Sequence, residues 1–370
     1  MLPAKTEVIE MPRWQAPQAS QSAFQETPLN QKEYYFMNKK DQKASSMRDF
    51  IAAVVFYLIL TPLLPVFLLG YVLWVVKFAI GGKSNASATA QAPLFARWVQ
   101  HHLGTRADEA ASRLWVVAPG APPLAWRLVA GPLLLAHRAT GYVLKTFRYP
   151  FVGEITIQNQ GAARQTFYDR VVQEYLPERA QFVILGAGFD TRAVNLPEDA
   201  KVRSFEIDTP ATIAVKREMQ GKAGIATTGV TLIAADFEKQ DWLTQLTGAG
   251  FDPGKPTLFI WEGVTMYLDR TAVEDSLRKI ASTAKGSVVA FDYFTTEVLE
   301  SESLMMRSIR ASLSAGGEPL KFGVNSTPPL RERVTELLQT CGLTLIEQST
   351  LGQETNGKRA WGGFGIAIVK

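Results

Sequence analysis

Carboxylate side chains recur at one kind of place in the second half of the chain, directly after short apolar runs. The runs end in "GAGFD", "EID", "AAD" and "WEG", which supply Asp190, Glu206 with Asp208, Asp236 and Glu262. A single acid after a strand is an ordinary turn residue, whereas four successive runs ending this way predict a shared acidic rim. Such a rim favours binding of a ligand with a positively charged centre.

The first of these runs, "FVILGAGFDTRAVNL" from Phe182, turns on Gly186 and Gly188. A dinucleotide site has a third glycine where Thr191 stands here, and it leaves the helix start free for a pyrophosphate. Asp190 at that helix start would repel a diphosphate. It would suit a cationic ligand without phosphates.

An acid about 20 residues beyond such a turn is expected to accept hydrogen bonds from ribose hydroxyls. Asp208 meets this spacing, with Glu206 as a competitor. Thr209 and Pro210 fit a helix N-cap and a first helical residue, which favours Asp208 at the rim. A ribose, an adenine and a positive charge without phosphate describe S-adenosylmethionine, which we predict to be the cofactor.

The acidic residues need a scaffold, and the spacing of the apolar runs predicts one. Five runs begin at residues 182, 202, 230, 257 and 287, with helix-like stretches between them. This pattern predicts an α/β fold with a mostly parallel, Rossmann-like sheet, which binds ligands at the carboxyl ends of its strands. Two further runs, at 343 and 363, predict an antiparallel hairpin at one edge.

The chain is predicted to have four sections. Residues 1–49 resemble a mobile polar tail, 50–80 a membrane helix or re-entrant hairpin, 81–160 a linker with interfacial or cap helices, and 161–370 the catalytic domain. Phe50 to Val76 carries no charge over 27 residues, too long for an ordinary core helix. Pro62 and Pro65 divide it into two short halves, so both a span and a hairpin remain open. Basic residues on both flanks place the catalytic domain in the cytoplasm.

Composition excludes several classes of function. The net charge is +4 with a pI near 9.0, but Lys and Arg are spread along the chain, so nucleic-acid binding is not expected. One cysteine, Cys341, rules out an internal disulfide, and no metal site is expected. All three histidines lie before residue 140, so the catalytic section has no imidazole base.

Seven ordered motifs carry a resemblance to a known family. They are "AARQTFYD" at 162, "LGAGFDTRA" at 185, "FEIDTP" at 205, "AADF" at 234, "WEGVTMYL" at 261, "FDYF" at 291 and "GEPLKFGV" at 317. Over about 155–370 the chain resembles the leucine carboxyl methyltransferase family of S-adenosylmethionine-dependent methyltransferases. The resemblance implies a class I methyltransferase fold; the apolar N-terminal segment is not part of the usual family pattern.

The resemblance also implies roles for individual residues. Arg164 would hold the methionine carboxylate, Asp208 the ribose, and Tyr267 would line the acceptor pocket. The other residues implied for the cofactor are Gly186 and Gly188 at the turn, Asp190 near the ammonium, Arg192 at the rim, and Asp236 with Phe237 around the adenine. Glu262 would lie near the ammonium or the transferred methyl and is, with Tyr267, a candidate catalytic residue. Thr166 stands where family members often carry a second arginine.

These features predict an O-methyltransferase acting at the membrane on a lipophilic small molecule or a carboxylate. A hydroxyl acceptor usually needs a general base, whereas a carboxylate needs none. Two other functions stay open. One is a membrane-bound nicotinamide oxidoreductase, against which Thr191 and the absence of a Tyr-x-x-x-Lys pair in the catalytic section argue. The other is a catalytically silent scaffold with the same fold.

Overall fold

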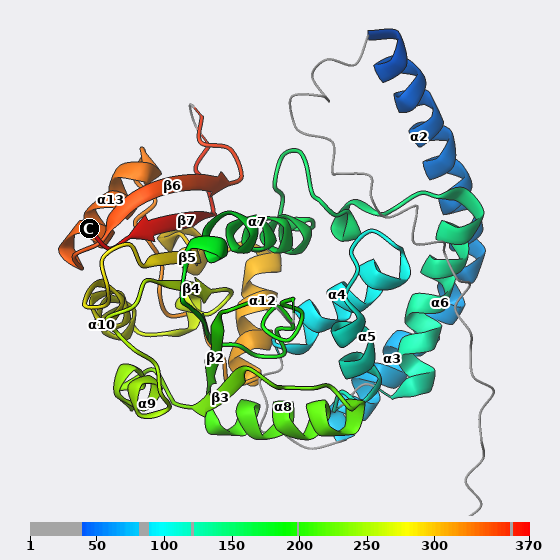
Figure 1. Cartoon of the computed structure of the whole chain (residues 1–370). Coiled ribbons are helices and arrows are strands. Elements are labelled where there is room, and N and C mark those ends of the chain that lie inside the picture. Colours follow the sequence, from blue (N-terminus) through cyan, green and yellow to red (C-terminus); the bar gives the residue numbers. More distant parts are fainter. Residues whose placement is uncertain (1–38, 81–88, 120–121, 198–199, 356–357) are drawn as a thin grey trace, which may run out of the picture. The chain divides into compact units, whose positions relative to one another are not determined.

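The computed structural model describes residues 39–370 apart from 81–88, 120–121, 198–199 and 356–357 (Figure 1). The chain divides into two compact units, Met1–Val54 and Val55–Lys370, and the second holds the sheet. Most of the predicted mobile tail, 1–49, lies outside the described residues. Its last part differs from the prediction, because helix α2 (Lys39–Leu60) begins within it.

A seven-stranded sheet forms the centre of the second unit, in the order β3-β2-β1-β4-β5-β7-β6. β1 to β5 run parallel, and β7 pairs antiparallel with both β5 and β6. The strands are β1 (Gln181–Leu185), β2 (Arg203–Asp208), β3 (Val230–Ala234), β4 (Thr257–Trp261), β5 (Val288–Phe294), β6 (Thr344–Leu351) and β7 (Gly362–Ile368). The predicted parallel sheet with an antiparallel edge pair is confirmed, and this strand order is that of class I methyltransferases.

Both faces of the sheet are covered, which explains why its strands read as continuous apolar runs. Val183 and Leu185 of β1 face a cluster that includes residues of α9 (Trp242–Gly248), α10 (Arg270–Ala281) and α13 (Leu330–Thr340). Phe182 and Ile184 alternate to the other face and join residues of α7 (Gln160–Tyr175). The remaining helices of the catalytic section are α8 (Pro210–Ala223), α11 (Thr296–Glu300) and α12 (Leu304–Ala315).

Three helices before the sheet form what we call the cap: α4 (Gln91–His102), α5 (Glu109–Val116) and α6 (Pro123–Thr140). Asp108 caps α5 by accepting the amide of Ala111 at 2.9 Å. The cap core also contains Phe189 from the glycine turn and Met219 from α8. Residues 91–140 therefore pack directly on the catalytic section, next to the end of β1.

The apolar segment forms one long helix. α2 passes through a 3-10 turn at Thr61–Leu63 into α3 (Leu64–Ile80), and both Leu60 and Leu64 keep helical backbone angles. The chain does not reverse direction at the two prolines, as a re-entrant hairpin would require. Met47–Trp74 is long and apolar enough to cross a membrane by length and composition alone.

Candidate active site

The glycine turn after β1 is held by the carboxylate at the end of β2. Gly186 and Gly188 have φ of 67° and 43°, which side chains rarely adopt. A Cβ on Gly186 would lie 2.3 Å from Val264, so the loop after β4 closes on the turn. Asp208 accepts the amides of Gly188 and Thr209, each at 2.7 Å. Turn and carboxylate thus form one rigid unit at the carboxyl edge of the sheet.

Asp208 keeps capacity for further hydrogen bonds. Thr209 caps α8 and Pro210 occupies its first turn, as the sequence predicted, so Asp208 stands at the strand end. Burial raises the pKa of Asp208 above its usual value, although the two backbone amides act in the opposite direction. Each carboxylate oxygen has a lone pair beyond the amide that it accepts, which suits a pair of ribose hydroxyls.

Glu206, the predicted competitor, has another partner. Its side chain is fully buried and lies 2.5 Å from Nζ of Lys216, which is itself fully buried. Lys216 also donates to the carbonyl oxygen of Asp190 at 2.9 Å. The Glu206–Lys216 pair therefore joins β2, α8 and the glycine turn from inside, and Asp208 alone of the two acids reaches the edge.

Beyond the turn, the predicted rim residues join a larger group of buried charges, which we call the ionic cluster. Arg192 contacts Asp169 at 2.7 Å and both Asp190 and Glu262 at 2.5 Å. Arg97 of α4 lies 2.7 Å from Asp190. The cluster comprises Arg97, Arg106, Arg192, Asp108, Asp169, Asp190 and Glu262.

The partners of Asp190 were not foreseen from the sequence. Its carboxylate accepts from Arg97 and Arg192, and it is 8% exposed, so it does not present a free oxygen to a ligand. Burial alone would raise the pKa of Asp190, but Arg192 and Arg97 more than offset it and hold the pKa well below its usual range. Thr191 stands where a dinucleotide site has its third glycine, and its hydroxyl donates to Asp108 at 2.7 Å.

The ionic cluster carries one negative charge in excess, since it combines three guanidinium groups with four carboxylates. The neighbouring pair of Arg164 and Asp292 is balanced, with Nε 3.1 Å from Oδ2. S-adenosylmethionine has one net positive charge from its ammonium, sulfonium and carboxylate. The two net charges are equal in size and opposite in sign, so the charge of the site fits this cofactor.

Arg164 is held on one side and open on the other. Its Nε faces Asp292, and Asp292 is fixed by the amide of Gly263 at 2.6 Å and the hydroxyl of Tyr168 at 3.0 Å. The side chain is 18% exposed, and within the described residues its two Nη atoms have no hydrogen bond. A Cβ on Gly263 would lie 3.2 Å from Nη1. This arrangement fits a guanidinium that receives a carboxylate.

The remaining predicted residues lie on either side of this centre. Asp236 follows β3, accepts the amide of Glu238 at 3.0 Å and pairs with Lys239 at 2.7 Å. Phe237 is buried, with its ring centroid 6.2 Å from Trp242 and 6.4 Å from Trp261.

Tyr267 follows β4 and lies on the other side of the centre. Burial raises its pKa; Arg164 lowers it and Glu318 raises it by smaller amounts. The phenol therefore stays protonated and can act as a hydrogen-bond donor.

Sequence reasoning missed several residues of the site. Asp292 lies inside the apolar strand β5 and was quoted only as part of a motif, although an acid in a buried strand is itself a signal. Arg97, Arg106 and Asp108 come from the cap, and no sequence pattern connects them to the turn. Within the described residues, no group of His, Cys, Asp and Glu could hold a metal ion.

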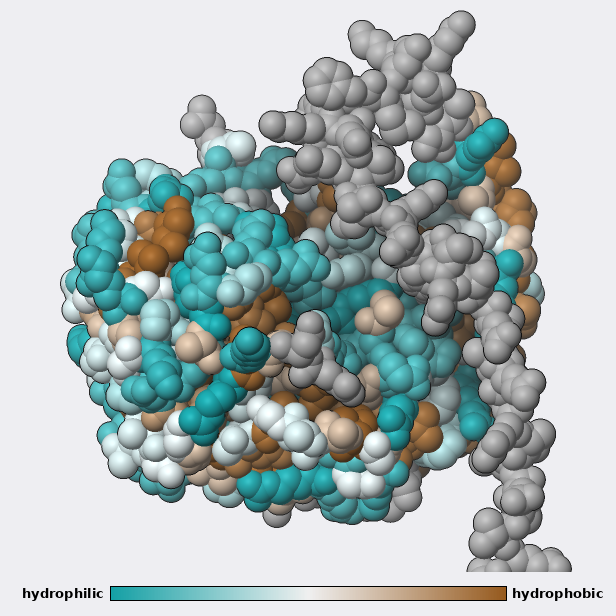
Figure 2. All heavy atoms as spheres, in the orientation of Figure 1, coloured by the Kyte–Doolittle hydropathy of each residue, from teal (hydrophilic) through white to brown (hydrophobic). Residues whose placement is uncertain are grey.

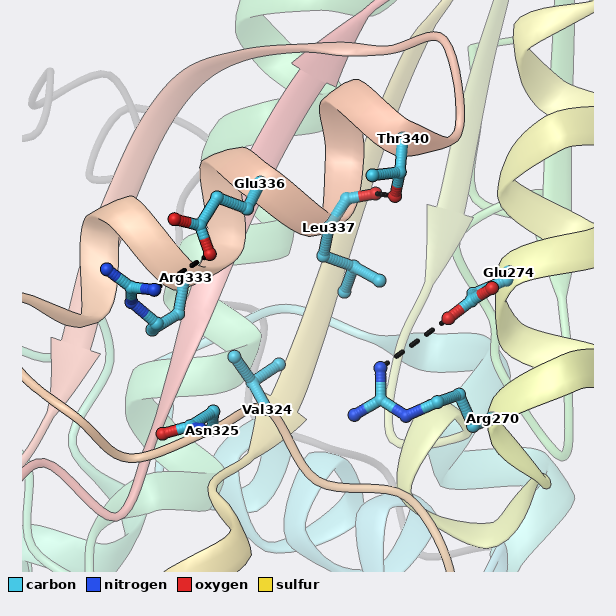
Figure 3. A pocket seen from close by; sticks show the side chains of 8 residues that line it. All are labelled: Arg270, Glu274, Val324, Asn325, Arg333, Glu336, Leu337 and Thr340. Atoms are coloured by element: carbon cyan, nitrogen blue, oxygen red, sulfur yellow. Dashed lines mark hydrogen bonds and ion pairs between the residues drawn. The ribbon is translucent and has the colours of Figure 1, made fainter.

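A separate cavity of about 240 Å³ lies between α10 and α13 (Figure 3). Its charged side chains are paired with one another, Arg270 with Glu274 at 3.5 Å and Arg333 with Glu336 at 2.9 Å. None of the predicted site residues lines it. The cavity is therefore not the candidate active site.

Comparison with known proteins agrees with this geometry. Residues 152–281 match the model of the leucine carboxyl methyltransferase family. Residues 152–281 are therefore similar to the leucine carboxyl methyltransferase family. A Mycolicibacterium vanbaalenii protein named as a proposed S-adenosyl-L-methionine-dependent methyltransferase is 39% identical over 127 residues, which are 34% of this chain and 42% of that protein. A Mycolicibacterium paratuberculosis protein with the same name is 31% identical over 218 residues, 59% of this chain and 66% of that protein.

The leucine carboxyl methyltransferase domain is thus supported by sequence, while the whole chain spans about half the length of the curated relatives it matches. A solved DUF574 family protein from Streptomyces avermitilis has a TM-score of 0.45 and 13% identity, covering 78% of this chain and 99% of that protein. The names of the curated relatives point to S-adenosylmethionine as the cofactor, and the residues around the glycine turn fit it.

Proposed function

We propose that this protein is an S-adenosylmethionine-dependent O-methyltransferase that acts at a membrane on a lipophilic carboxylic acid. The observation that carries the proposal is the charge of the site: an ionic cluster with one excess negative charge beside an arginine with two open Nη atoms. This combination matches a methionine moiety that carries an ammonium, a sulfonium and a carboxylate.

Each residue has a distinct task in this proposal. Arg164 binds the methionine carboxylate through its Nη atoms, and Glu262 faces the ammonium. Asp208 accepts the ribose hydroxyls, while Asp236 and Phe237 border the adenine. The bound cofactor supplies an electrophilic methyl group, and the protein aligns it with the acceptor and excludes water.

A carboxylate acceptor agrees with the side chains present. A carboxylate would accept the methyl group without losing a proton, so the protein would not need a general base. Tyr267 stays protonated, so it donates a hydrogen bond to the acceptor and does not act as a base. All three histidines lie in the cap, and Nδ1 of each has a backbone partner. Nδ1 of His101 accepts the amide of Asp108 at 3.1 Å, Nδ1 of His102 is 2.9 Å from the oxygen of Trp98, and Nδ1 of His137 is 3.0 Å from that of Tyr142.

Membrane attachment rests on the apolar helix, and the basic flanks favour a catalytic domain on the cytoplasmic side. Because the acceptor would be drawn from lipid, we expect it to be lipophilic. The division of the chain into four sections remains part of the proposal. The first section now ends where α2 begins, at Lys39.

The test uses the full protein, methyl-labelled S-adenosylmethionine and a membrane lipid extract. We expect a labelled lipid that loses its label as methanol in mild alkali, since methyl esters hydrolyse there and methyl ethers do not. Asp208→Ala should abolish labelling. An alkali-stable product would contradict a carboxylate acceptor. Cofactor binding without turnover would favour a silent scaffold, and tight NADPH binding in its place would favour an oxidoreductase.

A further inference from the structure

The apolar helix does not stand free of the second unit. From Val55 onward its buried and half-buried residues recur every three or four positions, so they share one helix face. They are Phe56, Ile59, Leu60, Leu63, Phe67, Gly70 and Trp74. Four of these, Phe56, Ile59, Leu60 and Trp74, belong to the same hydrophobic cluster as the cap core.

The helix lies along α6, in the opposite direction. A Cβ on Gly70 would be 2.6 Å from Cβ of Leu128 and 2.7 Å from the oxygen of Ala125, so the two helices meet closely there. At the other end, the ring of Phe56 lies 5.1 Å from that of Tyr142, just after α6. The contact therefore extends from Phe56 to Gly70 of the apolar helix, or about 21 Å.

This packing is incompatible with a helix that crosses the bilayer upright. From Phe56 to Trp74 the helix measures about 27 Å, close to the whole hydrocarbon thickness of about 30 Å. An upright crossing would draw α6 through the membrane beside it. The exposed Arg127 and Arg138 of α6 would then lie in hydrocarbon, where a charged side chain is strongly disfavoured.

The outer side of the two helices is apolar and exposed. Leu58 and Leu69 are 68% and 55% exposed, and on α6 Leu124 and Leu135 are 63% and 54% exposed. Leu124, Leu128 and Leu135 share one face of α6, and Leu128 contacts Gly70, so the two exposed surfaces adjoin. In Figure 2, hydrophobic residues follow the edge of the molecule along which Figure 1 draws α2.

Basic side chains flank this surface. Arg127 and Arg138 lie three helical turns apart on α6, in a row next to the one that contains Leu124 and Leu135. The Arg127 guanidinium lies 5.4 Å from the ring centroid of Trp126. Apolar residues beside arginine and tryptophan are typical of helices that lie in the membrane interface.

We propose that the protein is monotopic: the helix from Val55 to Trp74 and α6 lie side by side in the plane of the membrane, sunk into one leaflet. Arg127 and Arg138 contact anionic headgroups. The proposal rests on the membrane attachment in the proposed function and deepens it, because it restricts the acceptor to lipids of a single leaflet.

Depth measurements test this orientation. Single cysteines at Leu58, Leu69 and Leu135, in a Cys341→Ala background, carry a bimane label on vesicles of phosphatidylcholine and phosphatidylglycerol with spin-labelled lipids. We expect all three labels at the same shallow depth. An upright helix would separate positions 58 and 69 by about 16 Å of depth and would overturn the proposal. Unquenched labels together with a dimer in light scattering would show that a second copy covers the surface, and would also overturn it.

Vesicle binding of matched variants tests whether the exposed apolar surface contacts the membrane. Leu58→Glu combined with Leu69→Glu should weaken vesicle binding at least about tenfold. Val152→Glu, at an equally exposed apolar residue outside both helices, should leave it unchanged. Thermal unfolding without vesicles checks that each variant is folded. Methyl transfer is measured separately, so a protein that lies in the plane but transfers no methyl group would refute the proposed function and leave this orientation intact.

Discussion

The two sides of the candidate site hold their polar residues in different ways. Around the ribose position, Asp208 is fixed by two backbone amides and, among the residues that the structure describes, has no charged partner within hydrogen-bond distance. Around the methionine position, side-chain charges hold one another, and Arg192 alone contacts three carboxylates. One side is therefore shaped by the backbone of the sheet, and the other depends on mutual pairing of buried charges. Replacing a residue should therefore mainly affect cofactor binding on the ribose side and protein stability on the methionine side.

The largest effect is expected for Arg192→Ala. The change leaves Asp169, Asp190 and Glu262 without their shared guanidinium, and breaking a buried pair costs about 3 to 5 kcal/mol. Denaturant unfolding measures this free energy. Arg278→Ala, which removes an exposed pair with Glu274, is the control and should cost less than about 1 kcal/mol. Equal losses in the two variants would remove the distinction between the two sides.

Arg164→Lys should weaken S-adenosylmethionine binding about 10- to 100-fold, because an ammonium cannot receive a carboxylate with two parallel hydrogen bonds. Calorimetry gives the dissociation constant. Arg170→Lys on the same helix is the matched control, since Arg170 pairs with Glu174 at the surface. Unchanged affinity in Arg164→Lys would show that the methionine carboxylate binds elsewhere.

Asp208→Asn should lower cofactor affinity by about tenfold and lower the free energy of unfolding by about 1 to 3 kcal/mol, less than Arg192→Ala, because the amide oxygen of asparagine can accept only one of the two backbone hydrogen bonds. The same calorimetric titration compares it with Asp252→Asn, which lies near Gln181 at the opposite end of β1. Loss of stability without loss of affinity would reverse the roles given to the two sides.

The smallest effect concerns pH. Burial raises the pKa of Asp208, so its carboxylate, and with it cofactor affinity, should decline as pH falls through that raised value. In the ionic cluster, arginines hold the pKa of Asp169 and Asp190 below their usual range. The stability they contribute is present above the unfolded pKa and is lost only as pH falls through the folded one. Affinity should therefore decline before the protein unfolds, and Asp208→Asn should lack this first decline in a titration followed by calorimetry and circular dichroism.

Much of the sheet and of the ribose side could be predicted from sequence, because both depend on local patterns. Apolar runs define the strands, two glycines define the turn, and Thr209 with Pro210 defines the start of α8. The roles of Asp208, Arg164 and the other cofactor contacts stay predictions until binding is measured.

The pairing of charges on the methionine side could not be predicted, because its pairs join residues far apart in the chain. Arg97 and Asp190 are 93 positions apart and belong to different sections, and nothing periodic connects them. The same holds for Glu206, whose burial depends on a lysine one helix away. The sequence identified the acidic residues, but only the packing of the folded chain decides which of them keeps a carboxylate oxygen available to a ligand.

The close contact at Gly70 has a consequence for sequences beyond this one. A methyl group at this position would meet backbone and side-chain atoms of α6 at less than 3 Å, so even alanine would force the two helices apart. Close packing of the apolar helix against α6 therefore requires a glycine in the middle of the apolar stretch, whereas an apolar helix that served only as an independent membrane anchor would have no such requirement.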